Sequence, residues 1–244
     1  MAAAAMLLAA PAFGATVERH CTAMGSAYGP TARACVVTLR GEIVPGDAAL
    51  VADSIRESPD HVEVAALDSL GGDPFEALKI SDVLNRYFVV ASTGSCSPGE
   101  TCPASASGRC ASACALLFIA TNSRLGSEVY LHRPTFPAGY FSTLSGSEAE
   151  QAYNSSVTRL IAGLRQHRVP DPDIQRMMSI SSETVEKLEA GYPKYSPWMA
   201  EWLLARCGAE VDPTSRLFCE TDVELREQLR TQGKALPEWR SAYR

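Results

Sequence analysis

Residues 61–88 read HVEVAALDSLGGDPFEALKISDVLNRYF, and this stretch decides the fold class. The nearly continuous apolar run at its start predicts a strand over 61–69 that is buried in a sheet, because strands covered on both faces lose the usual polar alternation. Gly71 and Gly72 break that strand. A helix pattern follows at once, so the stretch predicts one unit of an α/β fold.

The helix after the glycine pair carries its own start signals. Asp73 is a favourable N-cap, and Pro74 is well tolerated in the first helical turn. The helix is predicted to run to about Phe88. Its apolar face is supplied by residues at helical spacing: Phe75, Leu78, Ile80, Val83 and Leu84.

The segments on either side continue the alternation of strands and helices. Strands are predicted at 35–44, 89–93 and 128–132, and helices at 47–58, 110–120, 148–167, 171–190, 197–206 and 220–231. This order predicts an α/β fold with a mainly parallel sheet whose faces are covered. We expect an α/β domain over 16–195 and a helical C-terminal extension over 196–244.

The N-terminus reads MAAAAMLLAAPAFGA over residues 1–15. An apolar run that ends in small residues is typical of a secretory signal peptide, with cleavage after Ala15, although no Lys or Arg precedes it. The alternatives are a fraying helix or a short membrane anchor, and the run is too short to span a bilayer. We therefore expect a soluble mature protein that is periplasmic or secreted.

The cysteine count agrees with export. An even number of cysteines in an oxidising compartment predicts disulfides, and the chain has eight: Cys21, Cys35, Cys96, Cys102, Cys110, Cys114, Cys207 and Cys219. The first two and the last two form natural local bridges, whereas the middle four allow three pairings. A zinc site built from these four would need C-x2-C knuckles or a histidine among them, and neither is present, so we expect no metal.

Composition and charge exclude several classes of function. Hydrophobic residues make up 46% of the chain and charged residues 20%, which is typical of a globular protein. The net charge of -6 leaves no basic footprint for nucleic acid. The chain has no G-x4-G-K-[ST] loop, so an ATP-driven partner is not expected, and no cofactor is predicted.

A group of polar residues and exposed backbone could support acyl transfer. Ser112 lies in CASAC at the predicted start of an apolar helix, and His132 lies in YLHRP at the end of a strand. A serine needs an adjacent base, and the oxyanion that forms needs N–H donors. The N–H groups of Gly72, after a strand, and Ala113, at a helix start, are candidate donors. Taken singly, each feature is also common in purely structural roles.

The order of these motifs, over about residues 62–134, resembles the Clp protease proteolytic subunit and its relatives in the crotonase-like superfamily. The matching text is SLGGDPFEALKI, ASACALLFIA and YLHRP, and it is most similar to an exported, periplasmic Clp-like branch with a C-A-S-A-C motif. The resemblance implies a Clp/crotonase-like fold of repeated ββα units. It also implies Ser112 as nucleophile, His132 as general base, and Gly72 with Ala113 as the oxyanion hole.

The chain departs from this family at two places. Leu70 stands where the family has proline, which predicts a looser oxyanion turn. The acid that would orient the histidine is not identified, because Gln175 falls near the family's aspartate position. Asp173 and Glu183 are the candidates for that role.

Two neighbouring features have alternative interpretations. Cys110 and Cys114 flank Ser112, and their bridges would either clamp the nucleophile or simply staple a long loop. Residues 133–147 contain Phe136, Tyr140 and Phe141, and they would either cover an extended substrate or form a contact in a homo-oligomer.

The leading hypothesis is a periplasmic serine hydrolase that cleaves peptide bonds in short or unfolded polypeptides without an ATPase partner. The main alternative is an inactive Clp-like protein that keeps the fold for binding or assembly. An acyl-CoA enzyme is a third hypothesis, which export disfavours. A Ser–Lys dyad using Lys79 or Lys187 is the last, and neither lysine holds a motif-matched position.

Overall fold

A computed structural model describes most of the chain between residues 14 and 200. The described residues are 14–23, 33–58, 60, 62–93, 108–126, 128–136, 139–181, 183–188 and 192–200. The cysteines at 96, 102, 207 and 219, the helix predicted at 220–231, and nearly all of the predicted signal peptide and C-terminal extension lie outside these residues.

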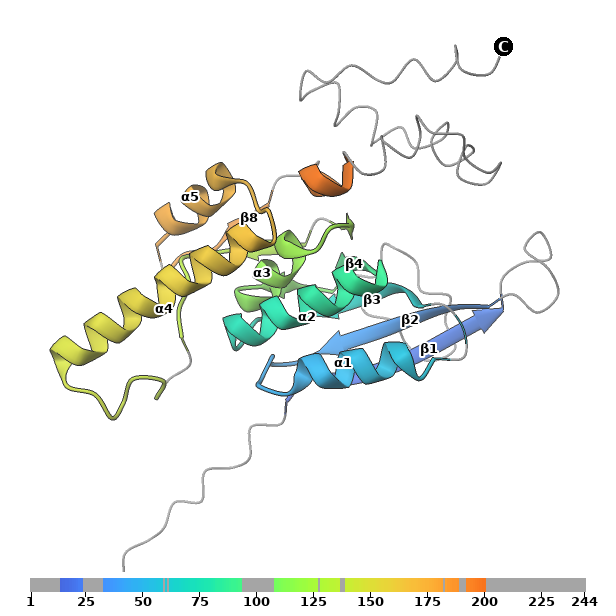
Figure 1. The fold of residues 1–244 in the computed structure, drawn as a ribbon, viewed down its shortest axis with the longest axis horizontal. Coiled ribbons are helices and arrows are strands. Elements are labelled where there is room, and N and C mark those ends of the chain that lie inside the picture. The colour runs from blue at the N-terminus through green and yellow to red at the C-terminus, as the bar shows by residue number, and fades with distance from the viewer. Residues whose placement is uncertain are drawn as a thin grey trace, which may run out of the picture.

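Within the described residues, the larger of two sheets has five strands in the order β1-β2-β3-β4-β6 (Figure 1). They are β1 (Thr16–Ala23), β2 (Arg33–Arg40), β3 (Val62–Asp68), β4 (Val90–Thr93) and β6 (Arg124–Leu125). Strand β1 pairs antiparallel with β2, and the other pairings are parallel. The α/β class predicted from the sequence is confirmed. Strand β1 was not predicted, and it adds an antiparallel edge to the mainly parallel sheet.

Three helices connect the parallel strands. They are α1 (Asp47–Arg56), α2 (Pro74–Tyr87) and α3 (Ala113–Ala120), and α2 packs between the other two (Figure 1). The predicted cap of α2 is present, since the Asp73 carboxylate accepts hydrogen bonds from the N–H groups of Phe75 and Glu76. Helix α3 is buried along its whole length, as its apolar sequence ACALLFIA requires.

The smaller sheet consists of β5 (Cys110–Ala111), β7 (Val129–Leu131) and β8 (Glu186–Lys187), in the order β5-β7-β8. Strands β5 and β7 are parallel, and β7 and β8 are antiparallel. The end of β3 joins this sheet, because Ser69 forms a bridge with Cys110. The helix predicted over 110–120 is therefore wrong at its start: residues 110–111 form a strand, and the helix begins at Ala113.

Two further helices follow the second sheet. Helix α4 (Gly146–Gln166) buries only Val157, Leu160 and Leu164, so its N-terminal half projects from the body of the molecule (Figure 1). Helix α5 (Asp171–Ser179) is much shorter than the predicted 171–190. Serine-rich sequence after Ser179 has low helix propensity, and pairing of residues 186–187 with β7 stabilises a strand there instead.

The described residues near the N-terminus take part in the fold. Ala15, the last residue of the predicted signal peptide, is buried, and its N–H donates to the Asp47 carboxylate over 3.2 Å. Cleavage after this residue would remove that contact. In the described part of the chain, no helix has the length and apolarity needed to cross a membrane.

The Cys21–Cys35 bridge predicted from the sequence is confirmed. These residues lie directly opposite each other in the β1–β2 ladder, and their Cα atoms are 4.0 Å apart. A second bridge joins Cys110 and Cys114. Intramolecular disulfides are typical of proteins that fold in an oxidising compartment, which agrees with export.

Candidate active site

Ser112 occupies a sharp turn between a strand and a helix. It follows β5 directly, and it is the N-cap of α3. Its backbone has φ 56° and ψ -123°, a conformation that residues with a Cβ rarely adopt. Such a conformation costs about 1–3 kcal/mol and persists only when the surrounding structure enforces it. Strained serines at strand-to-helix turns present their hydroxyl groups in many hydrolases.

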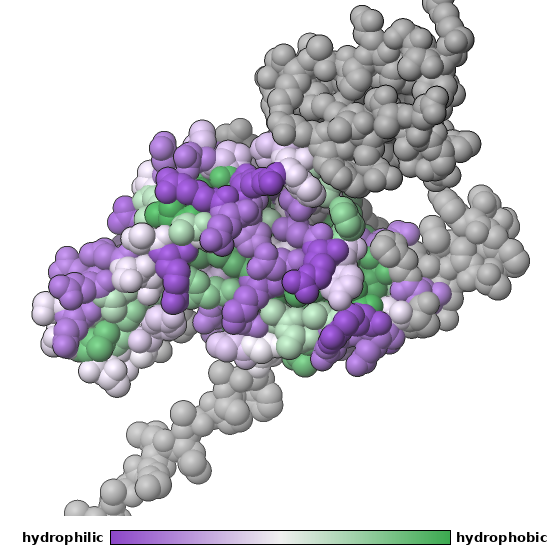
Figure 2. Space-filling view, in the orientation of Figure 1, coloured by the Kyte–Doolittle hydropathy of each residue, from purple (hydrophilic) through white to green (hydrophobic). Residues whose placement is uncertain are grey.

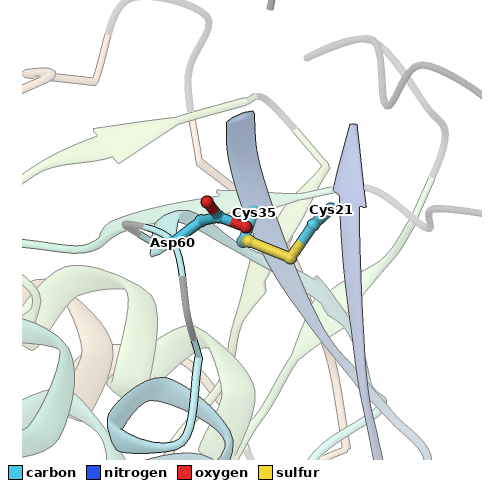
Figure 3. Close-up of side chains that lie close together, drawn as sticks. All are labelled: Cys21, Cys35 and Asp60. Atoms are coloured by element: carbon cyan, nitrogen blue, oxygen red, sulfur yellow. A yellow bond between two sulfur atoms is a disulfide. The ribbon is translucent and has the colours of Figure 1, made fainter. Parts of the chain in front are cut away.

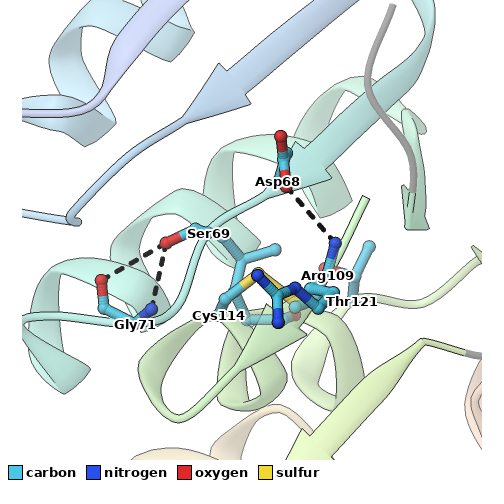
Figure 4. Close-up of a disulfide and its surroundings, with 8 residues drawn as sticks. Asp68, Ser69, Gly71, Arg109, Cys114 and Thr121 are labelled. Carbon is cyan, nitrogen blue, oxygen red and sulfur yellow. Dashed lines mark hydrogen bonds between the residues drawn. A yellow bond between two sulfur atoms is a disulfide. The ribbon is translucent and has the colours of Figure 1, made fainter. Parts of the chain in front are cut away.

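Hydrogen bonds and a disulfide hold this turn on both sides. The Ser112 N–H donates to the Tyr130 carbonyl of β7 over 3.1 Å, and the Ser112 carbonyl accepts from the Leu116 N–H over 3.1 Å. Cys110 and Cys114 are fully buried, and their disulfide closes a short covalent loop around Ser112 (Figure 4). Ser112 is half-buried, and its hydroxyl forms no hydrogen bond with the other described residues.

The glycine pair lies against this serine. A Cβ built on Gly71 would come within 2.5 Å of the Ser112 Cβ and 3.0 Å of its Oγ. One on Gly72 would lie 2.1 Å from the Ile43 carbonyl oxygen. Both glycines have positive φ, 115° and 136°. Glycine has no Cβ and tolerates positive φ, so only glycine at these two positions lets the turn pack this closely against Ser112 and Ile43.

The side chain of Ser69 ties the glycine turn to the end of β3. Its buried Oγ accepts from the Gly71 N–H over 3.1 Å and donates to the Gly71 carbonyl over 3.3 Å (Figure 4). Leu70, between them, is 67% exposed and therefore contributes little packing. The turn is fixed by Ser69 rather than by a proline at position 70.

Two backbone N–H groups near the elbow, one in the glycine turn and one directly after Ser112, have no acceptor among the described residues. The Gly71 N–H is bonded to Ser69, and the Ser112 N–H is bonded to Tyr130. The N–H groups of Gly72 and Ala113, by contrast, donate no hydrogen bond to any described residue. Ala113 is also the first residue of α3, where N–H groups lack helical partners and the helix dipole favours negative charge.

His132 follows β7, the strand adjacent to β5. The ladder pairs Ala111 with Tyr130, so Ser112 lies opposite Leu131 and His132 is one residue further along. From the usual strand spacing and rise, the Cα atoms of Ser112 and His132 are about 6 Å apart. Both residues thus lie at the carboxyl ends of adjacent parallel strands. The Ser112 hydroxyl and the His132 ring form no direct hydrogen bond in this structure of the described residues.

The His132 ring is oriented by a backbone carbonyl. Its Nδ1 lies 2.6 Å from the Arg133 carbonyl oxygen. In the tautomer that donates from Nδ1, the lone pair is on Nε2, as a general base requires. Arg133 itself is fixed at the end of α5, because its guanidinium donates to the Met178 carbonyl over 3.1 and 2.9 Å.

The two acids considered for the orienting role lie elsewhere in the described structure. The Asp173 carboxylate accepts from the Tyr192 hydroxyl over 3.0 Å, beside the buried guanidinium of Arg124. Burial raises the pKa of the Tyr192 hydroxyl well above its usual range. Glu183 is exposed. Within the described residues, neither acid forms a hydrogen bond with His132. The observed partner of its Nδ1 is the Arg133 carbonyl, a backbone group that sequence motifs cannot reveal.

The two lysines considered as alternative bases are engaged in ion pairs. Lys79 Nζ lies 2.8 Å from the Glu76 carboxylate, and Lys187 Nζ lies 2.5 Å from Glu128. Hydrogen bonds to these carboxylates raise the pKa of both amines. A lysine base needs the opposite shift, so neither lysine fits a Ser–Lys dyad.

Aromatic side chains gather on the segment that follows His132. Phe136 stacks on Phe75 at 6.1 Å and contacts Tyr140, Phe141 and Tyr153 at 5.2, 5.5 and 5.7 Å between ring centroids. The predicted covering segment is thereby fixed to the start of α2 and to α4. Because α2 begins directly after the glycine turn, this cluster adjoins the candidate site.

Potential metal ligands come together at one place within the described structure. Cys21, Cys35 and Asp60 lie within 4.8 Å of one another (Figure 3). The two sulfur atoms are joined in a disulfide, so they offer no thiolate to a metal. This group explains none of the chemistry around Ser112.

Comparisons with known proteins do not assign this chain to a class of protein. No protein-family model and no curated protein matches the chain. What the geometry defines is an α/β protein with a strained serine elbow, a glycine turn against it and a histidine on the adjacent strand.

Proposed function

We propose that this protein is an exported, periplasmic serine hydrolase that cleaves peptide bonds, with Ser112 as nucleophile and His132 as general base. The observation that carries the proposal is the backbone of Ser112, which adopts φ 56° and ψ -123° against Gly71. A buried packing serine has no need of such a conformation, and the disulfide around it adds rigidity that a nucleophile benefits from.

The reaction follows from the groups present. His132 Nε2 takes the proton of the Ser112 hydroxyl as Oγ forms a bond to the scissile carbonyl carbon. The oxyanion that develops is stabilised by the N–H groups of Gly72 and Ala113. The protonated His132 then donates its proton to the leaving amine, and water hydrolyses the acyl-enzyme by the same steps.

Reaction with a fluorophosphonate probe tests the nucleophile directly. The wild-type protein, expressed with its disulfides intact, is expected to be labelled at Ser112. Ser112→Ala should abolish labelling, whereas Ser142→Ala, at an exposed serine in the segment before α4, should leave it unchanged. Labelled peptide identified by mass spectrometry fixes the position. Folded wild-type protein that takes up no label would overturn the proposal.

One specific observation favours the inactive alternative. Ser112 and His132 follow adjacent strands, but within the described residues their side chains form no hydrogen bond with each other and no acid forms one with His132. An inactive binding protein would retain partner binding in the Ser112→Ala variant and would not react with the probe. The same labelling experiment therefore separates the two functions.

A further inference from the structure

A cavity of about 530 Å³ lies between the start of α2 and the C-terminal half of α4. This volume is within the range of binding sites for small ligands and single peptide residues. Figure 2 shows apolar surface exposed between hydrophilic residues on the face where α2 and α4 lie. Ser112 and His132 do not line this cavity, but Asp73, the residue that follows Gly72, does.

Apolar residues from both helices form part of the cavity wall. Phe75 and Leu78 from α2 line one side, and Gly163 from α4 lines another. A Cβ on Gly163 would lie 2.7 Å from Leu78 Cδ1, so the glycine allows α2 and α4 to approach each other closely beside the cavity. Phe75 is held by its stacking on Phe136, and Tyr140 lines the cavity from the same aromatic cluster.

The acidic groups of the cavity are already committed to the fold. Asp73 Oδ1 caps α2 through the N–H groups of Phe75 and Glu76. Glu76 Oε1 accepts from two N–H groups at the start of α1, each over 2.9 Å, and its Oε2 binds Lys79. Burial opposes ionisation of Glu76, but these hydrogen bonds lower its pKa, so Lys79 faces a carboxylate that neutralises it.

The lining holds two carboxylates, Asp73 and Glu76, and two cations, Lys79 and Arg159; among the described residues, Arg159 is the cation without an ion pair. Its guanidinium lies 3.9 Å from the centroid of the Phe75 ring, and the described residues place no carboxylate against it. A guanidinium on an aromatic ring presents its N–H groups in the plane that suits a carboxylate. The cavity thus combines apolar wall residues with a guanidinium that has no carboxylate partner among the described residues.

We propose that this cavity binds a carboxylate carried on an apolar or aromatic group. The ligand that fits the neighbouring elbow is the C-terminal residue of a peptide, with its carboxylate on Arg159 and its side chain against Phe75 and Leu78. This assignment of the ligand to a peptide rests on the proposed function, whereas binding of the carboxylate does not.

Titration of a catalytically silent protein tests the cavity. In ¹⁵N-labelled Ser112→Ala protein, N-acetylphenylalanine is expected to shift the amide signals of Ala162 and Gly163. Its neutral amide should bind at least about tenfold more weakly, because it lacks the charged group that Arg159 recognises. 3-Phenylpropionate carries the same ring and carboxylate without the amide bond. If it binds as well as N-acetylphenylalanine, the ligand class is the free acid rather than a peptide terminus.

Variants of two arginines on α4 complete the experiment. Arg159→Gln should remove the preference for the acid over the amide. Arg165→Gln is the matched control, because Arg165 is paired with Asp171 outside the cavity, and it should keep the preference. Equal affinity of acid and amide, or an unchanged preference in Arg159→Gln, would overturn the proposal. Probe labelling of Ser112 is measured separately, so failure of one proposal does not imply failure of the other.

Discussion

The strain at Ser112 predicts that glycine at this position gives a more stable protein than alanine does. In Ser112→Gly the φ of 56° is no longer unfavourable, whereas in Ser112→Ala the Cβ remains in the same conformation. Strain of this kind is worth about 1–3 kcal/mol, and the added freedom of glycine in the unfolded chain costs about 0.5–1 kcal/mol. We therefore expect Ser112→Gly to be more stable than Ser112→Ala by about 1 kcal/mol, although neither variant can be acylated.

Urea unfolding, followed by circular dichroism without reductant, measures this difference. With a denaturant dependence of about 2 kcal/mol/M, the midpoint of Ser112→Gly should lie about 0.5 M above that of Ser112→Ala. Ala111→Gly is the matched control, because Ala111 is the preceding residue, in the regular strand β5. A glycine there should destabilise by about 0.5–1 kcal/mol. If Ser112→Gly loses as much stability relative to Ser112→Ala as the control loses relative to wild type, the elbow is not strained.

Three other perturbations follow from the structure. Gly71→Ala should destabilise the protein by about 3 kcal/mol, because the added Cβ is strained at positive φ and collides with Ser112, and it should abolish probe labelling. The control is Gly46→Ala, at φ 109° with open space around it. In the same assays it should be destabilised by the backbone strain alone and should still be labelled. Replacing Cys110 and Cys114 together with alanine should cost about 2 kcal/mol in urea unfolding, because the loop is short, and should slow labelling; an unchanged labelling rate would show that the bridge is only a staple. Burial lowers the pKa of His167 below 6.5 despite the nearby carboxylate of Asp82, so the unfolded chain binds more protons than the folded one. The free energy of unfolding should therefore fall as the pH drops below about 6.5. His167→Gln should flatten this pH dependence, and an equal slope in both proteins would contradict the reasoning.

Local signals in the sequence were sufficient for α2 and for the glycine turn. Asp73, Pro74 and the apolar face specify the helix without help from distant residues, and the observed cap agrees. The serine elbow is different. The small residues of CASAC suit either a helix or a strand, and only pairing of residues 110–111 with β7 makes them a strand.

The same limit applies to the elements that flank the site. β8 has two residues and depends on its pairing with β7, so no periodic pattern reveals it. β1 has the sequence TVERHCTA. The predicted Cys21–Cys35 bridge indicates that this segment lies near residue 35, but it does not predict the register of the β1–β2 pairing. Elements stabilised by tertiary pairing rather than by their own pattern are the ones that sequence reasoning missed.

The partner of His132 has consequences for the rate of any reaction at Ser112. A carboxylate both selects the histidine tautomer and stabilises the imidazolium that forms, whereas the Arg133 carbonyl is a neutral dipole that contributes mainly the first effect. Where a triad acid is removed, the rate falls by up to about 10⁴-fold although nucleophile and oxyanion hole are intact. A site with Ser112, His132 and this carbonyl should therefore react well with a strongly electrophilic phosphonate but turn over peptides slowly. If the site acts as proposed, slow turnover leaves substrate selection mainly to binding contacts, such as those in the cavity between α2 and α4.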